Sequence, residues 1–108
     1  SLPKKVRKQA LKIVLSSKLK KGLLKVVDNI VLDEIKTKKF LEIAHNLNLN
    51  KALIITNGRE KKLELAARNV PEFQILPVEG LNVYDVLRYD YLVLLQDSIP
   101  KIEGFLLS

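Results

Sequence analysis

The chain has 108 residues, 47% of them hydrophobic and 29% charged, which provides enough apolar material for one shared core and argues against disorder. The absence of Cys excludes a disulfide framework, a thiolate metal site and a Cys nucleophile. No apolar run approaches the roughly 20 residues that a membrane helix needs, so we expect a soluble protein with no membrane partner.

The excess of positive charge is confined to one end of the chain. Eight of the 19 Lys and Arg residues lie within residues 1–22, where there is no acid, and the other eleven are balanced by 12 Asp and Glu. No internal repeat or Pro/Gly-rich linker divides the sequence. We therefore predict a single globular domain over residues 1–108, made of a basic helix within 1–22 and a near-neutral α/β body over 23–108.

Helical and strand patterns alternate along the chain. In chain order they predict a helix over Pro3–Lys21, a strand over Leu23–Val27, a helix over Thr37–Leu47, a strand over Ala52–Thr56, a helix over Glu60–Asn69, a strand over Phe73–Pro77, a helix over Asn82–Arg88, a strand over Tyr91–Leu95 and a final helix. Asn82 is the predicted N-cap of the fourth helix, and Asp97 or Ser98 that of the last.

This alternation predicts an α/β fold, with a parallel sheet covered by helices on both faces. Ala52–Ile55 and Tyr91–Leu95 are unbroken apolar runs, as central strands should be, whereas Lys25 and Gln74 interrupt the other two strands. We therefore place the first and third strands at the edges of the sheet. Two strand orders share this pair of edges.

Acidic residues follow several predicted strands, at the edge where a ligand of an open parallel sheet would bind. Asp28 and Asp97 are a conceivable Mg²⁺ pair and Glu79 lies at the same edge, but acids in such places are common for structural reasons, and no Gly-rich phosphate-loop pattern is present. The only histidine, His45, has no second His and no thiol to complete a metal site. We predict no enzyme activity, no cofactor and no metal, with a nucleotide-binding α/β domain as a distant alternative.

The basic helix presents apolar and cationic faces on a helical wheel. Val6, Ala10, Ile13, Val14 and Ser17 fall on one side, which we expect to pack on the sheet, and Lys4, Lys5, Arg7, Lys8 and Lys12 fall on the other. Leu11, Leu15 and Leu19 form a second apolar stripe that should meet a neighbouring helix or a partner.

The cations of this helix lack the acidic partners that an ordinary surface helix uses. Lys8 stands one helical turn from both Lys4 and Lys12, which adds repulsion between like charges. A solvated face is the usual explanation of a charge run, but an external polyanion would neutralise this one. Nucleic acid is the first candidate. An anionic membrane is the second, because the apolar face lacks the Trp and Phe of an interfacial helix.

The stretch Leu76-Pro-Val-Glu-Gly-Leu-Asn-Val-Tyr-Asp-Val-Leu-Arg-Tyr-Asp-Tyr-Leu-Val-Leu closely resembles the C-terminal signature of the family of bacterial-type ribosomal large-subunit protein four. Further pieces follow in the order of that family, at Pro3–Leu11, Leu24–Asp28, Lys36–Lys38, Lys51–Thr56 and Leu65–Asn69. The resemblance covers nearly the whole chain. It implies a three-layer α/β/α fold with a four-stranded, mainly parallel sheet in the order 1-4-2-3.

The resemblance also implies a role. Members of the family are structural constituents of the large ribosomal subunit, bind its ribosomal RNA beside neighbouring ribosomal proteins, and aid assembly. They function in the ribosome of the bacterial cytoplasm or of an organelle, and some bind their own messenger leader as autoregulators. The family's tunnel loop and N-terminal segment precede the matching region, so we do not expect these residues to line the peptide exit tunnel.

We predict that the RNA-binding residues are the cations of the basic helix and of the Lys36–Lys38 motif. The full set is Lys4, Lys5, Arg7, Lys8, Lys12, Lys18, Lys20, Lys21, Lys36 and Lys38, followed by Arg88. Arg88 has an alternative role, because it could pair with Asp85 or Asp90 and hold the fold. Ile35 stands where the family tends to carry Pro, and we expect Thr37 to cap the helix that follows.

Overall fold

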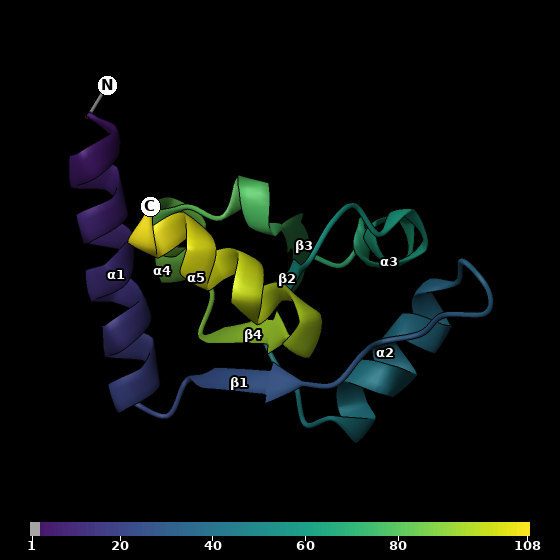
Figure 1. Ribbon diagram of the computed structural model, residues 1–108. Helices are drawn as coiled ribbons and strands as arrows, with labels where there is room; N and C mark the ends of the chain where they lie inside the picture. The colour runs from purple at the N-terminus through teal and green to yellow at the C-terminus, as the bar shows by residue number, and fades with distance from the viewer. Residues whose placement is uncertain (1–2) are drawn as a thin grey trace.

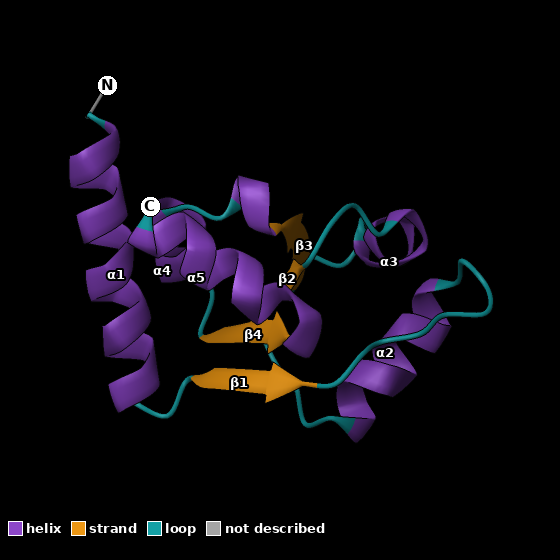
Figure 2. Ribbon diagram, viewed as in Figure 1, coloured by secondary structure: helices purple, strands orange, loops and turns teal. Residues whose placement is uncertain are grey.

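A computed structural model describes residues 3–108, so the first two residues of the predicted basic segment 1–22 lie outside the described residues. Helices and strands alternate as predicted (Figures 1 and 2). The elements are α1 Lys4–Lys20, β1 Leu24–Val27, α2 Thr37–Asn46, β2 Ala52–Thr56, α3 Lys61–Ala67, β3 Phe73–Pro77, α4 Val83–Arg88, β4 Tyr91–Leu95 and α5 Ile99–Leu107. Short 3₁₀ turns over Val78–Gly80 and Gln96–Ser98 precede α4 and α5. Three of the four strands have the predicted bounds.

The four strands form one parallel sheet in the order β1-β4-β2-β3. Strands β1 and β3 are the edges, which confirms the prediction made from Lys25 and Gln74. Every residue of the central strand β2 is buried. Parallel strands in this position are covered on both faces, which is why β2 and β4 read as unbroken apolar runs.

Helices cover the two faces of the sheet in separate layers (Figure 1). One core lies under α2 and α3 and joins Phe40, Ala44 and Leu63 to Ile54 and Val93 of the sheet. The other core lies under α1, α4 and α5, and is built from Leu11, Val86, Ile102, Leu53 and Leu92, among others. The predicted three-layer α/β/α architecture is therefore confirmed.

Two helices end in a residue with a left-handed backbone. After α1, Gly22 has φ +72°, its N–H donates to the Leu19 carbonyl, and the Leu23 N–H donates to the Lys18 carbonyl at 2.9 Å. This pair of bonds is a Schellman motif. Asn48, at φ +56°, ends α2 with the same pattern. Each motif turns the chain sharply at the end of its helix.

The predicted helix caps have mixed outcomes. Asn82 is the N-cap of α4, and its side-chain oxygen accepts the Asp85 N–H at 2.9 Å, as predicted. Ser98 stands at the N-cap position of α5, but its backbone is already helical and its hydroxyl donates to the Leu95 carbonyl at 2.6 Å. The prediction that Thr37 caps α2 is wrong, because the helix begins at Thr37 itself and Lys36 precedes it without a side-chain cap.

Candidate RNA-binding surface

The helix α1 packs through a different face from the one predicted. Leu11 is buried and Leu15 is half-buried in the core shared with α4 and α5, whereas Ile13 and Val6 are 68% and 43% exposed. The predicted packing face is therefore wrong for these two residues. The physical reason is that α1 stands beside α4 and the start of β1, at the margin of its layer, and meets its neighbours along the leucine stripe. The alternative in which that stripe meets a neighbouring helix is confirmed for Leu11 and Leu15, whereas Leu19 is 64% exposed.

Two cations of α1 are engaged within the fold. The Lys18 ammonium donates to the backbone carbonyls of Tyr89 and Asp90 at 2.7 and 2.9 Å, and burial lowers the pKa of this ammonium. The Lys8 ammonium donates to the Ser108 carbonyl at 3.0 Å and lies 5.3 Å from the centre of the Phe105 ring. These two lysines connect α1 to the start of β4 and to the end of α5.

The remaining cations of α1, and Lys21 at its C-cap, face solvent. Lys4, Lys5, Arg7, Lys12, Lys20 and Lys21 are exposed, and within residues 3–108 none of them is part of an ion pair. Lys5, Lys12 and Lys20 are spaced by seven and eight residues, so they lie in line along one side of the helix, away from the buried stripe. Lys4 and Arg7 precede Leu11 by seven and four residues, so they lie on the Leu11 side, in the first turns of the helix. The N-terminal turns of α1 also project beyond the rest of the molecule (Figure 1). We call these six residues the α1 cationic face.

The other predicted RNA-binding residues lie elsewhere. Lys36 and Lys38 are exposed at the start of α2, in the helical layer opposite α1, and Lys36 forms an ion pair of 2.9 Å with Glu34. Arg88 ends α4, with its guanidinium 5.4 Å from the centre of the Tyr89 ring. No ion pair joins it to Asp85 or Asp90 in the described part of the chain. The predicted set is thus split between the two sides of the sheet.

The acids that follow the strands do not converge on one site. Glu79 forms an ion pair with Lys101 of α5, and Asp28 and Asp97 are exposed. A hollow near the ends of β1 and β2 is lined by residues 29–32 and 59–63 and contains none of these three acids. The described residues include no group of three His, Asp or Glu side chains placed to hold a metal ion. His45 lies exposed on α2.

The role of Lys18 was missed at the level of the sequence, although the pattern contained the information. Lys18 follows Leu11 by seven residues and Leu15 by three, so it continues the stripe that the fold buries. A cation on a buried stripe needs an internal acceptor. The sequence does not reveal the acceptors, because the Tyr89 and Asp90 carbonyls come from a region more than 70 residues away.

No helix in residues 3–108 has both the length and the apolar character needed to cross a bilayer.

Comparison with known proteins places the chain in a family. Residues 1–105 match the model of the ribosomal protein L4/L1 family. The chain is 57% identical over 106 residues to large ribosomal subunit protein uL4 of Desulfatibacillum aliphaticivorans, which covers 98% of this chain and 52% of that protein.

Two further relatives carry the same name. The protein from Desulfosudis oleivorans is 52% identical over 107 residues, which covers 99% of this chain and 52% of the relative. The protein from Syntrophus aciditrophicus is 46% identical over 108 residues, which covers 100% of this chain and 50% of the relative. The chain therefore spans about half the length of the curated relatives that it matches. With its signature, its strand order and these matches in agreement, this chain belongs to the ribosomal protein L4/L1 family.

Proposed function

We propose that this chain binds ribosomal RNA as a structural constituent of the large ribosomal subunit and that the α1 cationic face is the main contact. The relatives named above are proteins of the large ribosomal subunit, which supports the assignment of the partner. The proposed role is structural rather than enzymatic. In the cell the protein would be part of the bacterial ribosome, in contact with neighbouring ribosomal proteins, and would aid assembly of the subunit.

The observation that carries this proposal is the lack of internal partners for the α1 cationic face. Six exposed cations on one helix repel one another, and no acid of residues 3–108 pairs with any of them. RNA phosphates would neutralise this charge, and release of counterions would supply most of the affinity. The rigid helix would hold the cations in register along the RNA backbone.

Lys8 and Lys18 have a different place in the proposed interface. Their ammonium groups already donate to carbonyls of the fold, so we assign them to orienting α1. Lys36, Lys38 and Arg88 would form secondary contacts, since Lys36 and Lys38 stand in the opposite layer and cannot share one flat RNA surface with α1.

The test is RNA affinity across a salt series. The chain should bind the 5′ domain of large-subunit ribosomal RNA more tightly than an unrelated RNA of equal length. Log affinity should fall with log salt at a slope equivalent to roughly four to six phosphates. Changing Lys5, Lys12 and Lys20 together to Gln should flatten that slope by about two. A matched variant with Lys39, Lys51 and Lys62 changed to Gln, all exposed and outside α1, should keep the original slope.

Two outcomes would contradict the proposal. Equal and weak binding of both RNAs would show that this chain does not recognise ribosomal RNA by itself. Equal flattening of the slope by both triple variants would show that net charge, and not the α1 cationic face, determines binding.

A further inference from the structure

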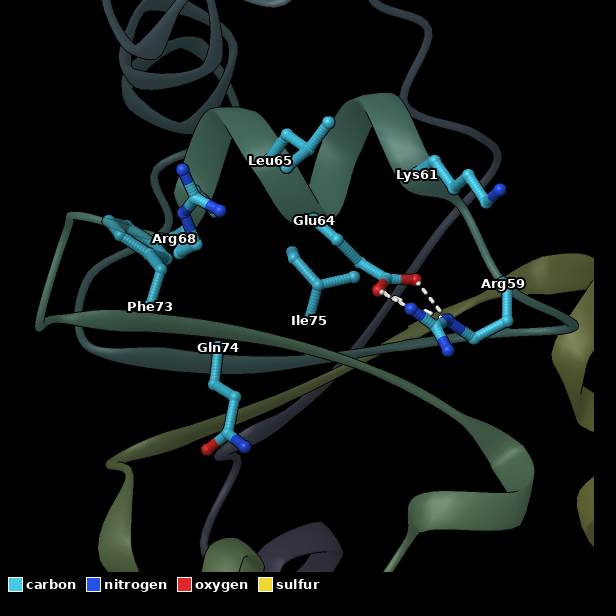
Figure 3. A pocket seen from close by; sticks show the side chains of 9 residues that line it. Arg59, Lys61, Glu64, Leu65, Arg68, Phe73, Gln74 and Ile75 are labelled. Atoms are coloured by element: carbon cyan, nitrogen blue, oxygen red, sulfur yellow. Dashed lines mark hydrogen bonds and ion pairs between the residues drawn. The ribbon is translucent and has the colours of Figure 1, made fainter.

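A groove separate from the α1 cationic face runs between α3 and the edge strand β3 (Figure 3). It belongs to the helical layer opposite α1. Its floor is apolar and includes Phe73 and Ile75 of β3, with Leu65 of α3 above them. Leu65 is 42% exposed, so the groove has an apolar surface that the fold leaves accessible.

Cations stand at both ends of this groove. Arg68 lies at the end of α3 beside Phe73, and Arg59 lies at the opposite end, before α3 begins (Figure 3). Lys61 also lines the groove. Glu64 is the one acid in the lining, and it is already paired with Arg59. The groove is therefore positive, with apolar surface between two guanidinium groups.

The pair with Glu64 fixes the direction of Arg59. Its Nε donates to both Glu64 carboxylate oxygens at 3.0 and 3.1 Å, and its Nη2 donates to one of them at 2.8 Å. The other terminal nitrogen, Nη1, lies outside this pair. An oriented guanidinium loses less side-chain entropy when it binds an incoming carboxylate.

The strand β3, which forms the floor of the groove, has an open edge on the side away from β2. The Ala52 N–H donates to the Glu72 carbonyl at 2.9 Å, and Ala52 lies opposite Phe73 in the register. In a parallel ladder this geometry turns Gln74 toward β2 and turns the N–H and C=O of Ile75 toward the outer edge. The Phe73 N–H is already bonded to the Val70 carbonyl. Because Pro has no N–H, Ile75 is the residue of β3 left to pair with an added strand.

We propose that this groove binds an extended acidic peptide segment of another protein, which adds a strand to β3. The peptide backbone would pair with Ile75, an apolar side chain would cover the floor, and acidic side chains on either side of it would meet Arg68 and Arg59. Residues two apart in a strand point to the same face, so two acids four residues apart would flank one apolar side chain, as Arg68 and Arg59 flank the apolar floor of the groove. An acid-x-apolar-x-acid pattern therefore fits the groove.

Two other occupants are disfavoured by the same features. A second copy of this chain would bring Arg59 and Arg68 of two grooves together and add repulsion between molecules of net charge +7. RNA would contact the guanidinium groups, but it has no backbone donor and acceptor spaced like those of a strand, and so would leave the pairing groups of Ile75 unused.

The test uses a dye-labelled peptide, Gly-Thr-Glu-Thr-Val-Thr-Glu-Thr-Gly, with the ¹⁵N-labelled chain. The peptide should bind at low salt, and saturation should slow hydrogen exchange of the Ile75 amide at least about tenfold while the Gln74 amide is unchanged. Arg68→Glu should weaken binding by about tenfold, because one attraction becomes a repulsion. Lys62→Glu is the matched control, since it makes the same change on the same helix outside the groove lining. Lys62→Glu should leave the affinity for the peptide within about twofold of that of the original chain.

Several results would overturn the proposal. Peptide binding without protection of Ile75, or equal weakening by both variants, would show attraction by net charge alone. Tighter binding of a short oligouridylate, lost in Arg68→Glu, would assign the groove to RNA. Protection of Ile75 that rises with protein concentration in the absence of peptide would assign it to a second copy of the chain. Arg68 is exposed, and circular dichroism of Arg68→Glu verifies its folding. None of these results bears on the α1 cationic face.

Discussion

Charged residues in this protein differ sharply in what they do, although the sequence presents them as equivalent. Lys18 donates to two carbonyls inside the fold, whereas Lys20, two residues later, is exposed. Arg59 is held by a carboxylate that also accepts the Glu60 N–H at 3.0 Å. The surroundings of each side chain therefore decide whether its charge stabilises the fold or is available to a partner.

The Glu64 carboxylate should stabilise the fold at neutral pH and lose this effect in acid. The hydrogen bond from Arg59 is the main cause that lowers the pKa of Glu64 below its ordinary value. A lowered pKa in the folded state stabilises the protein at neutral pH, and this stabilisation is lost as pH falls through the folded-state pKa. Because the pair is partly exposed, Glu64→Gln should lower the free energy of unfolding at pH 7 by about 0.5–1 kcal/mol.

Urea unfolding at two pH values measures this effect. The difference between Glu64→Gln and the original chain should shrink as pH falls below the ordinary pKa of Glu, about 4.3, and should disappear once pH lies below the lowered folded-state pKa of Glu64. Glu42→Gln, at an exposed position of α2, is the control and should change little at either pH. A difference for Glu64→Gln that persists at low pH would indicate lost packing in place of lost charge.

Lys18 should stabilise the fold without contributing a phosphate contact. Lys18→Met keeps the aliphatic stem but removes the donor to the Tyr89 and Asp90 carbonyls, so the free energy of unfolding should fall by about 1–2 kcal/mol. The salt slope of RNA binding should not change. Lys20→Met should do the opposite, with stability kept and the slope reduced by about one. A flattened slope with unchanged stability for Lys18→Met would place Lys18 at the RNA.

At the scale of elements, helix ends decide how the layers are connected. The motif after α1 reverses the chain so that β1 enters the sheet next to β4, and Asn48 ends α2 in the same conformation before β2. Both ends require a left-handed residue, and Gly adopts this conformation without the cost that a Cβ adds. The direction in which α1 leaves the sheet therefore depends on Gly22.

Two glycine substitutions should have opposite effects. Gly22→Ala has space for the new Cβ, but the φ of +72° is strained for Ala, so the free energy of unfolding should fall by about 1 kcal/mol. Gly104 lies inside α5, where a new Cβ also has open space. Gly104→Ala should therefore raise the free energy of unfolding by about 0.5–1 kcal/mol, because Ala favours the helix more than Gly does. Thermal and urea unfolding measure both. A stabilised Gly22→Ala would show that the motif does not hold the end of α1.

At the scale of the whole molecule, charge is segregated. The eight cations of residues 1–22 stand on α1 and its C-cap, at one side of the molecule, while the body over residues 23–108 is near neutral. Such a distribution would direct an anionic partner toward α1, and repulsion between its like charges costs stability in the free protein.

Salt should therefore raise the stability of the free protein. Added salt screens repulsion over distances beyond about 10 Å at 0.1 M, so the thermal midpoint should rise between low salt and about 0.5 M. The variant with Lys5, Lys12 and Lys20 changed to Gln should have a higher midpoint at low salt and a weaker response. The variant with Lys39, Lys51 and Lys62 changed to Gln should respond like the original chain. A midpoint that falls with salt would show that attractive ion pairs dominate.

The strands and their order could be read from the sequence because both depend on local pattern. Unbroken apolar runs identified β2 and β4 as central, and Lys25 and Gln74 marked the edges, since a polar side chain is tolerated where one neighbouring strand is missing. The choice between the two orders that share these edges came from the family resemblance and not from pattern.

The orientation of α1 could not be read in the same way. Its wheel carries two apolar stripes, and pattern alone favoured the one with Val6 and Ile13, whereas the fold buries Leu11. The reason is that α1 stands at the margin of its layer, so its buried face depends on the helices beside it. These are α4 and α5, which are distant from α1 in the sequence.

The sequence by itself determined the α/β class, the edge strands, the family and the concentration of cations in residues 1–22, because composition, periodicity and motif are properties of neighbouring residues. Only the tertiary structure decided which cations are available to a partner. Lys8 and Lys18 are engaged by carbonyls from the other end of the chain, and the groove beside β3 is formed only when α3 packs against the edge of the sheet. Contacts between residues that are distant in the sequence cannot be read from the local pattern around either residue.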